Sequence, residues 1–231
     1  MAIEVISFDL DDTLWPVRPV IYAAIEDMNA VIEAAVPDYS SRMDDATMLA
    51  LRKARLEREP LLRYDITTMR LRLLEDSLER CGLRGERLQR VARDAFQTFM
   101  RGRNRVTFFD GALDTLAELK KTYRLIGLTN GNADYREAGL GELFEFSISP
   151  VEAQARKPDS GIFAATLAAA DVGAEQILHV GDNLDEDIAG AVAAGWRSVW
   201  VNRSGAPPEP ERGYVASVCE LDELPELIAA L

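Results

Sequence analysis

Three carboxylates and a threonine stand together near the N-terminus, at the end of a short apolar run. The run covers residues 3–8, and the sequence DLDDT follows at residues 9–13. Parallel α/β sheets hold their chemistry beyond the carboxyl ends of strands, and crowded carboxylates repel one another unless a cation or shared proton compensates them. On a straight strand Asp9 and Asp11 would share a face, so one could attack phosphorus while the other moves protons and Mg²⁺ screens the anions. The stretch therefore predicts a metal-dependent site that acts on a phosphate group. The alternative is that these aspartates only cap the start of a helix.

Two later segments add groups that could hold a phosphate. Thr129, Asn130 and Gly131 follow an apolar stretch, and a hydroxyl, an amide and a flexible backbone NH form a small phosphate-binding turn. Lys157 precedes an expected helix and could be a fixed positive charge that keeps carboxylates ionised and stabilises a transferring phosphoryl group. Taken alone, the first segment is also a common turn sequence and the second also fits a surface lysine.

The last cluster is acidic and again follows an apolar stretch. Hard cations take oxygen ligands, so Asp182, at the end of that stretch, is the best metal-ligand candidate. Asp187 could hold Lys157 or a metal-bound water, whereas Asp185 and Glu186 are expected at a solvated helix start.

Other catalytic arrangements find no support in the chain. It has no Ser-His-Asp arrangement and no glycine-rich dinucleotide or P-loop motif. Its only histidine, His179, lies in an apolar stretch, and we expect it to pack rather than to react. Cys81 and Cys219 are far apart and outside any metal-binding pattern, so we expect two buried packing thiols in a reduced compartment.

Short apolar strands that alternate with helices predict a parallel sheet buried on both faces. The expected strands cover residues 3–8, 124–128, 145–149, 176–180, 198–201 and 214–218. The expected helices between and after them cover residues 112–121, 134–139, 160–170, 186–194 and 224–231. Three of the four polar clusters follow such strands, and strand ends at one sheet edge lie together in space. The sheet therefore brings the clusters to one place.

Residues 16–105 interrupt this alternation with a block rich in Arg, Glu, Leu, Met and Ala. Four helices are expected there, at residues 17–35, 44–58, 66–81 and 85–101, and their short links indicate a small bundle. Because the first strand belongs with the later sheet, the bundle is an insertion. We expect an α/β, Rossmann-like core from residues 1–15 and 106–231, with residues 16–105 as an inserted α-helical domain.

Charge and hydropathy exclude some partners. The chain has 26 Lys and Arg against 39 Asp and Glu, a formal charge of −13, which opposes binding to a nucleic-acid backbone. No apolar run approaches the 18 or so residues of a membrane span, and the N-terminus lacks the pattern of a signal peptide. We therefore expect a cytoplasmic protein without membrane or nucleic-acid partners; monomer and homodimer both stay open.

Together the four clusters resemble the haloacid dehalogenase superfamily of phosphohydrolases. Residues 9–13 resemble its first motif, 129–130 its second, 157–158 its third, and 181–182 with Asp187 its fourth, and the insertion resembles a C1-type cap. The resemblance implies that Asp9 attacks phosphorus to form an aspartyl phosphate. It implies that Asp11 protonates the leaving alcohol and then activates water.

The resemblance also implies a ligand set. Mg²⁺ would be held by the Asp9 carboxylate, the Asp11 backbone carbonyl and Asp182, with Asp187 behind them or acting through water. The phosphoryl oxygens would be held by Thr129, Asn130 and Lys157. The implied cap would close over the substrate and read its leaving group.

The implied reaction is hydrolysis of a small phosphate monoester. Dehalogenases of the superfamily lack the second aspartate, so Asp11 favours phosphate-ester cleavage. A phosphotransferase or sugar-phosphate mutase would keep both aspartates and is the alternative; a non-catalytic phospho-ligand binder is a third. A narrower resemblance, to bacterial phosphatases that act on flavin mononucleotide and a riboflavin precursor, is carried by residues 18–21, 65–67, 129–133, 139–141, 144–146 and 177–181.

Overall fold

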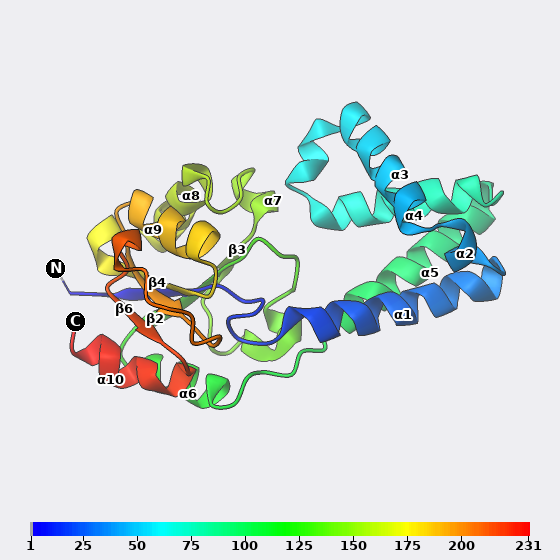
Figure 1. The fold of residues 1–231 in the computed structure, drawn as a ribbon. Coiled ribbons are helices and arrows are strands. Elements are labelled where there is room, and N and C mark those ends of the chain that lie inside the picture. The colour runs from blue at the N-terminus through cyan, green and yellow to red at the C-terminus, as the bar shows by residue number, and fades with distance from the viewer. Residues whose placement is uncertain (1) are drawn as a thin grey trace. The chain divides into compact units, whose positions relative to one another are not determined.

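The computed structural model describes residues 2–231. The chain forms two compact units, Met1–Val17 with Val106–Leu231 and Arg18–Arg105. We call the first the core unit and the second the helical unit, and each is described by itself (Figure 1).

A parallel sheet of six strands, in the order β3-β2-β1-β4-β5-β6, builds the core unit. The strands are β1 Val5–Phe8, β2 Arg124–Leu128, β3 Ser147–Ile148, β4 Ile177–Gly181, β5 Arg197–Val201 and β6 Ala216–Val218. β1 pairs with β2 on one side and β4 on the other. All of its residues are buried, as expected for a strand covered on both faces. The expected α/β core with a parallel sheet is confirmed.

Helices cover both faces of this sheet. α8 (Ser160–Ala170) and α9 (Ala189–Ala193) lie on one face, and α6 (Ala112–Leu119) and α10 (Leu224–Ala229) on the other (Figure 1). The register brings the residues after β1, β2 and β4, which are Asp9, Thr129 and Asp182, to the same edge of the sheet.

Three elements of the core unit differ from the expectation. The strand expected at 145–149 has only two residues, because Ser149 and Glu152 form a capping box that starts a short helix, α7 (Pro150–Ala153). The helix expected at 134–139 is a single π-type turn, Arg136–Leu140, within which Gly139 has a φ of 97°. The helix expected at 186–194 begins earlier, as a π-type turn at Leu184–Ile188 that continues into α9.

Five helices form the helical unit: α1 Val17–Ala35, α2 Tyr39–Arg42, α3 Asp45–Arg58, α4 Ile66–Arg80 and α5 Gly85–Arg103. Asp44 and Asp65 begin α3 and α4, because each carboxylate accepts a hydrogen bond from the backbone NH three residues on, at 2.8 Å. α1 and α5 approach closely at Gly102, where an added Cβ would lie 2.9 Å from the Cα of Ala24. The short α2 was not expected.

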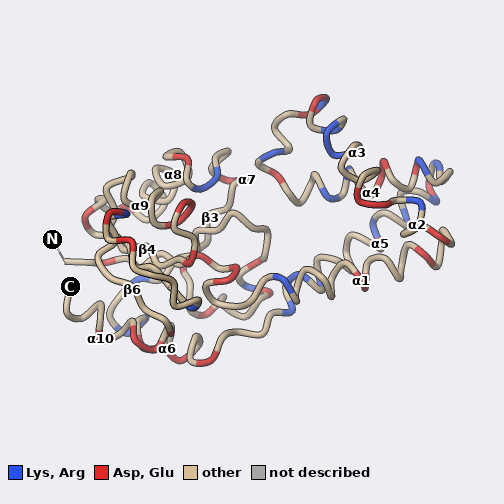
Figure 2. The backbone as a smooth tube through the Cα atoms, in the orientation of Figure 1, with Lys and Arg blue, Asp and Glu red and all other residues tan. Residues whose placement is uncertain are grey.

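Charge is divided unevenly between the units (Figure 2). Residues 18–105 hold 17 of the 26 Lys and Arg and 14 of the 39 Asp and Glu, a formal charge of +3, which leaves a formal charge of −16 for the rest of the chain.

Two further expectations concern membrane spans and the cysteines. Among residues 2–231, no helix is long and apolar enough to cross a membrane. Cys81 is half-buried and Cys219 is exposed, so the expectation of two buried thiols was wrong for Cys219, which follows the last residue of β6 at the surface.

Candidate active site

Asp9 and Lys157 form the buried centre of the polar cluster. Asp9 directly follows β1, and its backbone NH donates to the carbonyl of Val180 in β4 at 2.9 Å. The Nζ of Lys157 lies 2.6 Å from Asp9 Oδ1 and 2.6 Å from Asp187 Oδ1, and it donates to the Leu128 carbonyl at 2.7 Å. Only 1% of the Lys157 side chain is exposed. One ammonium therefore ties together the ends of β1 and β2 and the turn after β4.

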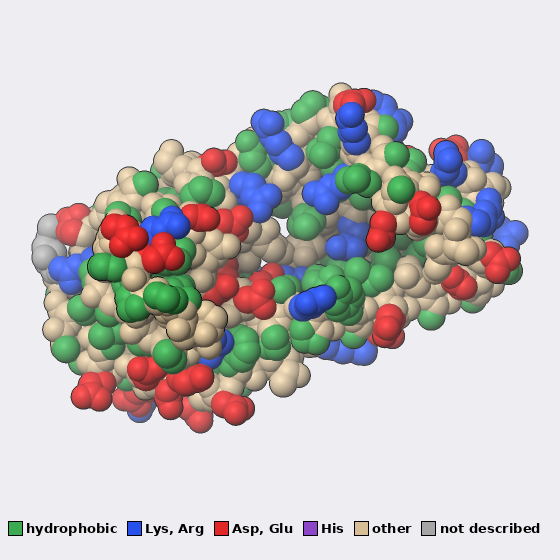
Figure 3. Space-filling view, viewed as in Figure 1, with side chains coloured by type: hydrophobic (Ala, Val, Ile, Leu, Met, Phe, Trp, Pro, Cys, Tyr) green, Lys and Arg blue, Asp and Glu red, His purple; other side chains and the backbone are tan. Residues whose placement is uncertain are grey.

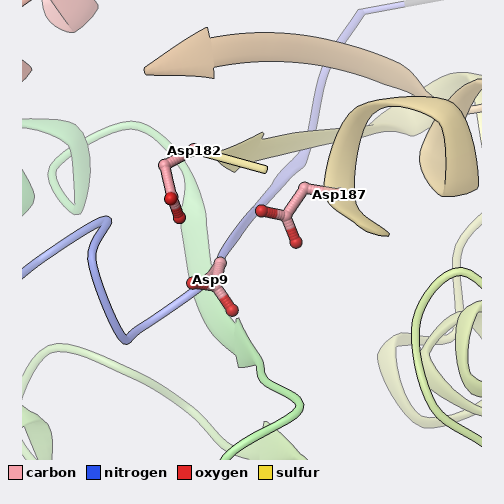
Figure 4. A group of neighbouring side chains, drawn as sticks. All are labelled: Asp9, Asp182 and Asp187. Carbon is pink, nitrogen blue, oxygen red and sulfur yellow. The ribbon is translucent and has the colours of Figure 1, made fainter. Parts of the chain in front are cut away.

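Three carboxylates point toward one another at this edge (Figure 4). Asp9, Asp182 and Asp187 each offer an oxygen, and these oxygens lie within 4.8 Å of one another. The Asp182 carboxylate accepts from Thr13 Oγ1 at 3.0 Å, and its backbone carbonyl accepts from Trp200 Nε1 at 2.9 Å. Asp182 is thus fixed through both its side chain and its backbone.

Asp187 has most of its acceptor capacity occupied by the protein. Its Oδ1 accepts from Lys157 and lies 3.4 Å from His179 Nε2, and its Oδ2 accepts from the Asn183 backbone NH at 3.0 Å. The carboxylate packs so closely that a Cβ on Gly181 would lie 2.4 Å from it. His179 itself is buried between Asp187 and Ser7, whose Oγ lies 3.1 Å from Nδ1. Asp187 therefore holds the Lys157 ammonium through an ion pair in this structure.

The balance of charge sets the pKa values of these groups. Burial raises the pKa of Asp9 well above its ordinary value, against the attraction of Lys157. Burial, followed by repulsion from Asp187, raises the pKa of Asp182 to about 6. Burial alone would lower the pKa of Lys157 and raise that of Asp187, but their mutual attraction shifts both the opposite way and keeps the pair ionised. The single ammonium of Lys157 therefore does not balance the negative charge of Asp9, Asp182 and Asp187.

Asp11 and Asp12 lie in the turn that leaves β1. Trp15 Nε1 donates to Asp11 Oδ1 at 2.9 Å, while Asp12 adopts a left-handed φ of 61° and accepts from the Val17 NH at 2.9 Å. On a straight strand Asp12 would point away from Asp9 and Asp11, but the strand ends at Phe8, so this geometry does not apply here. All three aspartates line the same cavity.

Asn130 joins the loop after β2 to the Lys157 loop. Its Oδ1 accepts from the Lys157 NH at 2.8 Å, and its Nδ2 donates to the Lys157 carbonyl at 2.9 Å and to Glu186 Oε2 at 2.8 Å. The buried hydroxyl of Thr129 accepts from the Gly131 NH at 2.9 Å. Both amide hydrogens of Asn130 are therefore already donated, which makes it a positioning group for Lys157 in this arrangement.

Glu186 is a site residue that sequence reasoning missed. It was expected at a solvated helix start, yet it lines the cavity and accepts from Asn130. The cause is local, because the Asn183 side chain accepts from the backbone NH groups of Asp185 and Glu186 and begins a π-type turn. Asp185 points elsewhere, to Arg212 at 2.7 Å. Asp185 and Glu186 are adjacent and both acidic, so the sequence alone does not indicate which of them lines the cavity.

The cavity formed by these groups has a volume of about 260 Å³. It is lined by Asp9, Asp11, Asp12, Thr129, Asn130, Gly131, Asp182, Asn183, Glu186 and Asp187. Six of these residues are acidic, and the neighbouring ammonium of Lys157 is already shared by two carboxylates. An anion would be repelled here unless a cation entered too. The all-oxygen donor set and the excess of negative charge fit a hard divalent cation such as Mg²⁺.

Comparison with known proteins places this site in a family. The profile of the haloacid dehalogenase-like hydrolases matches residues 3–195. The chain belongs to this family. The chain is 32% identical to the 5-amino-6-(5-phospho-D-ribitylamino)uracil phosphatase of Escherichia coli, over 97% of this chain and 91% of that protein. It is 31% identical to the phosphoserine phosphatase of Thermus thermophilus, over 96% and 97%.

A solved structure gives a different activity for a similar fold. The crystal structure of a 2-haloacid dehalogenase from Pseudomonas syringae pv. Tomato has a TM-score of 0.93 and 34% sequence identity, over 99% of both chains. Haloacid dehalogenase-like hydrolases thus include phosphatases and dehalogenases similar to this chain. The chemistry of the site has to separate the two reactions.

Proposed function

We propose that this haloacid dehalogenase-like hydrolase is a Mg²⁺-dependent phosphomonoesterase for small phosphorylated metabolites. The observation that carries the proposal is the presence of two carboxylates with different surroundings in one cavity. Asp9 is buried against Lys157, whereas Asp11 is held by the neutral NH of Trp15. A fixed nucleophile and a separate proton carrier are what phosphate-ester cleavage requires.

In the proposed reaction Asp9 attacks phosphorus, and the bond from phosphorus to the ester oxygen breaks. Asp11 gives its proton to the leaving oxygen, and the product alcohol departs. Asp11 then takes a proton from water, the water oxygen attacks the phosphorus of the aspartyl phosphate, and inorganic phosphate leaves. Asp9 is restored as a carboxylate and Asp11 as an acid, so the cycle balances.

Lys157 and its neighbours would hold the phosphoryl group. The Lys157 ammonium and the Thr129 hydroxyl would bind phosphoryl oxygens, and Asn130 would keep the Lys157 loop in place through its two bonds to the Lys157 backbone. Direct binding of phosphate by the Asn130 amide requires release of Glu186. Mg²⁺, when bound by the Asp9 and Asp182 carboxylates and the Asp11 carbonyl, would neutralise charge between enzyme and substrate. Asp187 would act behind them by anchoring Lys157.

The excess of carboxylates argues against dehalogenation. A halide leaves carbon as a stable anion and needs no proton donor, but it does need a positive site to receive it. Within the cavity of the core unit, the ammonium of Lys157 is already held by Asp9 and Asp187. A phosphate ester needs the additional acid, and a divalent cation suits the six acidic side chains.

A screen for released phosphate tests the proposal. Flavin mononucleotide and 5-amino-6-(5-phosphoribitylamino)uracil are the first substrates to assay, because a relative 32% identical to the chain is a phosphatase for the latter. Nucleotide and sugar phosphates complete the set, each with and without Mg²⁺, and chloride release from 2-chloropropionate is measured in parallel. An added alcohol as a second phosphoryl acceptor separates hydrolysis from phosphotransfer.

Two variants give the screen its control. Asp9→Asn should lower Mg²⁺-dependent phosphate release about 10⁴-fold or more, as loss of a nucleophile does. Asp12→Asn removes an equal charge from the same cavity and should keep activity within about threefold. Chloride release without phosphate release, or an Asp9→Asn variant as active as the wild type, would refute the proposal.

A further inference from the structure

The helical unit contains a second, larger cavity of about 580 Å³. It lies among α1, α2, α3 and α4, and every residue that lines it belongs to the helical unit. This volume is in the range of sites for small organic molecules, about 300–1,000 Å³. The cavity shares no residue with the acidic site of the core unit.

The wall of this cavity is apolar and adaptable. Four of the six methionines of the chain line it: Met28, Met43, Met48 and Met69. Methionine side chains are flexible and polarisable, so they fit ligands of varied outline. Leu49 and Ile66 also line the cavity with 68% and 40% of their surfaces exposed, which leaves apolar side chains at the surface. The space-filling view shows hydrophobic side chains interspersed with Lys and Arg over α3 and α4 (Figure 3).

One charged group in the wall has no counter-ion within the part of the chain that the structure describes. Arg70, on α4, lines the cavity, and its guanidinium lies 3.8 Å from the ring centroid of Phe99. Its Nε is buried without a hydrogen-bond partner, and among residues 2–231 no carboxylate forms an ion pair with it. Burial, followed by repulsion from Arg103 and Arg52, lowers the pKa of Arg70 to about 10, so it stays charged at neutral pH. The Arg70 side chain is half-buried, and a charge that is withdrawn from water is costly unless it is paired.

A second arginine and the charge of the unit favour an anion near Arg70. Arg52, on α3, also lines the cavity, and its charge acts on Arg70. Two aspartates line the cavity too, but the Asp44 carboxylate already caps α3, and neither pairs with Arg70. The planar guanidinium is the side chain best suited to bind carboxylate, sulfonate or phosphate oxygens with two parallel hydrogen bonds.

We propose that this cavity binds a small organic anion, whose apolar body contacts the methionine wall and whose acidic group pairs with Arg70 and Arg52. The residues that line this cavity all belong to the helical unit and none belongs to the proposed phosphatase centre, so the proposal does not depend on the chemistry of that centre. Its ligand is set by two properties of the wall: an apolar surface large enough for a ring system, and an unpaired guanidinium within it.

Two fluorescent probes of one shape test this proposal on the full chain. 1-Anilinonaphthalene-8-sulfonate carries an apolar ring system and a sulfonate, and N-phenyl-1-naphthylamine has the same rings without the charge. The sulfonate should bind saturably at one site, with an affinity that falls as salt rises. Arg70→Gln should weaken the sulfonate at least tenfold and leave the neutral probe within about twofold. Arg80→Gln, an exposed change on the same helix, should alter neither.

Several outcomes would overturn the inference. Sulfonate affinity that is unchanged in Arg70→Gln places the bound probe elsewhere, and a parallel loss of both probes assigns Arg70 a purely structural role. If Arg70→Gln does not fold, Arg52→Gln replaces it, because Arg52 is exposed; a threefold loss for the sulfonate alone supports the site, and no loss contradicts it. Asp9→Asn should bind the sulfonate like the wild type, so this result is independent of the phosphatase assay.

Discussion

The two cavities of this chain present opposite electrostatic problems. The cavity of the core unit gathers six acidic side chains around about 260 Å³, with one buried ammonium beside them. The cavity of the helical unit places an unpaired arginine in an apolar wall around about 580 Å³. Folded proteins pair most of their buried charges. These two exceptions are the reason for the two proposals: a divalent cation together with a phosphate ester in the core cavity, and an organic anion in the cavity of the helical unit.

After the loss expected for Asp9→Asn, the largest effect comes from removing the proton carrier of the core cavity. Asp11→Asn should lower turnover of an alkyl phosphate such as flavin mononucleotide about 10³-fold, because its leaving oxygen needs a proton. The same variant should release p-nitrophenol from p-nitrophenyl phosphate with a smaller loss in the first turnover, because that leaving group is stable as an anion. Stopped-flow and steady-state assays measure both. If Asp11→Asn lowers the rate by the same factor for both leaving groups, Asp11 is not the general acid.

Removing the ammonium tests whether the core cavity is held together by charge. Lys157→Met should lower the free energy of unfolding by about 3 kcal/mol, because breaking a buried ion pair leaves carboxylates uncompensated. The loss should be larger at pH 8 than at pH 5, since carboxylates regain protons at the lower pH. Urea titration measures it, and Lys121→Met, at an exposed pair with Glu118, is the control that should match the wild type. A loss independent of pH would contradict the electrostatic cause.

Mg²⁺ and pH should act together on stability. The pKa of Asp182 is about 6 in the folded chain and near 4 in the unfolded one, so the folded state holds the extra proton between these values. Without metal, this group should lower the free energy of unfolding by about 2 kcal/mol as pH rises from 4 to 6. Mg²⁺ replaces the proton, so it should stabilise the chain more at pH 8 than at pH 5. Thermal melts in Mg²⁺ and in EDTA measure this, and a metal effect that is equal at both pH values would contradict it.

The smallest expected effect comes from two glycine-to-alanine variants, one in the core unit and one in the helical unit. A Cβ at Gly181 would lie 2.4 Å from the Asp187 carboxylate, and one at Gly102 would lie 2.9 Å from Ala24. Gly181→Ala and Gly102→Ala should each cost about 1–3 kcal/mol in the free energy of unfolding. Only Gly181→Ala should also lower kcat for phosphate release, because Asp187 anchors Lys157. A kcat loss of the same size in Gly102→Ala would contradict the assignment of the kcat effect to the contact between Asp187 and Lys157.

Much of the core unit follows from local sequence rules. Short apolar runs set the parallel strands, and the polar residues directly after them, Asp9, Thr129 and Asp182, come to one edge because parallel strands end together. The long helices of the insertion also follow from periodicity and from caps such as Asp44 and Asp65.

The remaining features depend on packing that no local pattern encodes. Glu186 reaches Asn130 because Asn183 starts a π-type turn, which changes the phase of the following residues. Asp12 lines the cavity because β1 ends at Phe8 and residues 12–14 form a turn, so the alternation of a strand no longer holds there. Arg70 looks like any arginine on an amphipathic helix until α1, α3 and α4 pack around it.

Rapid-quench analysis of Asp11→Asn with p-nitrophenyl phosphate and Mg²⁺ tests the proposed chemistry most directly. Asp9 should still attack, but the variant lacks the base that activates water. We predict a burst of about one p-nitrophenol per chain, followed by slow turnover, with the mass of one phosphoryl group on the peptide that contains Asp9. The double variant with Asp9→Asn should show neither. Steady turnover without a burst, or a phosphoryl group on another residue, would contradict the assignment of Asp9 as the nucleophile and Asp11 as the acid and base.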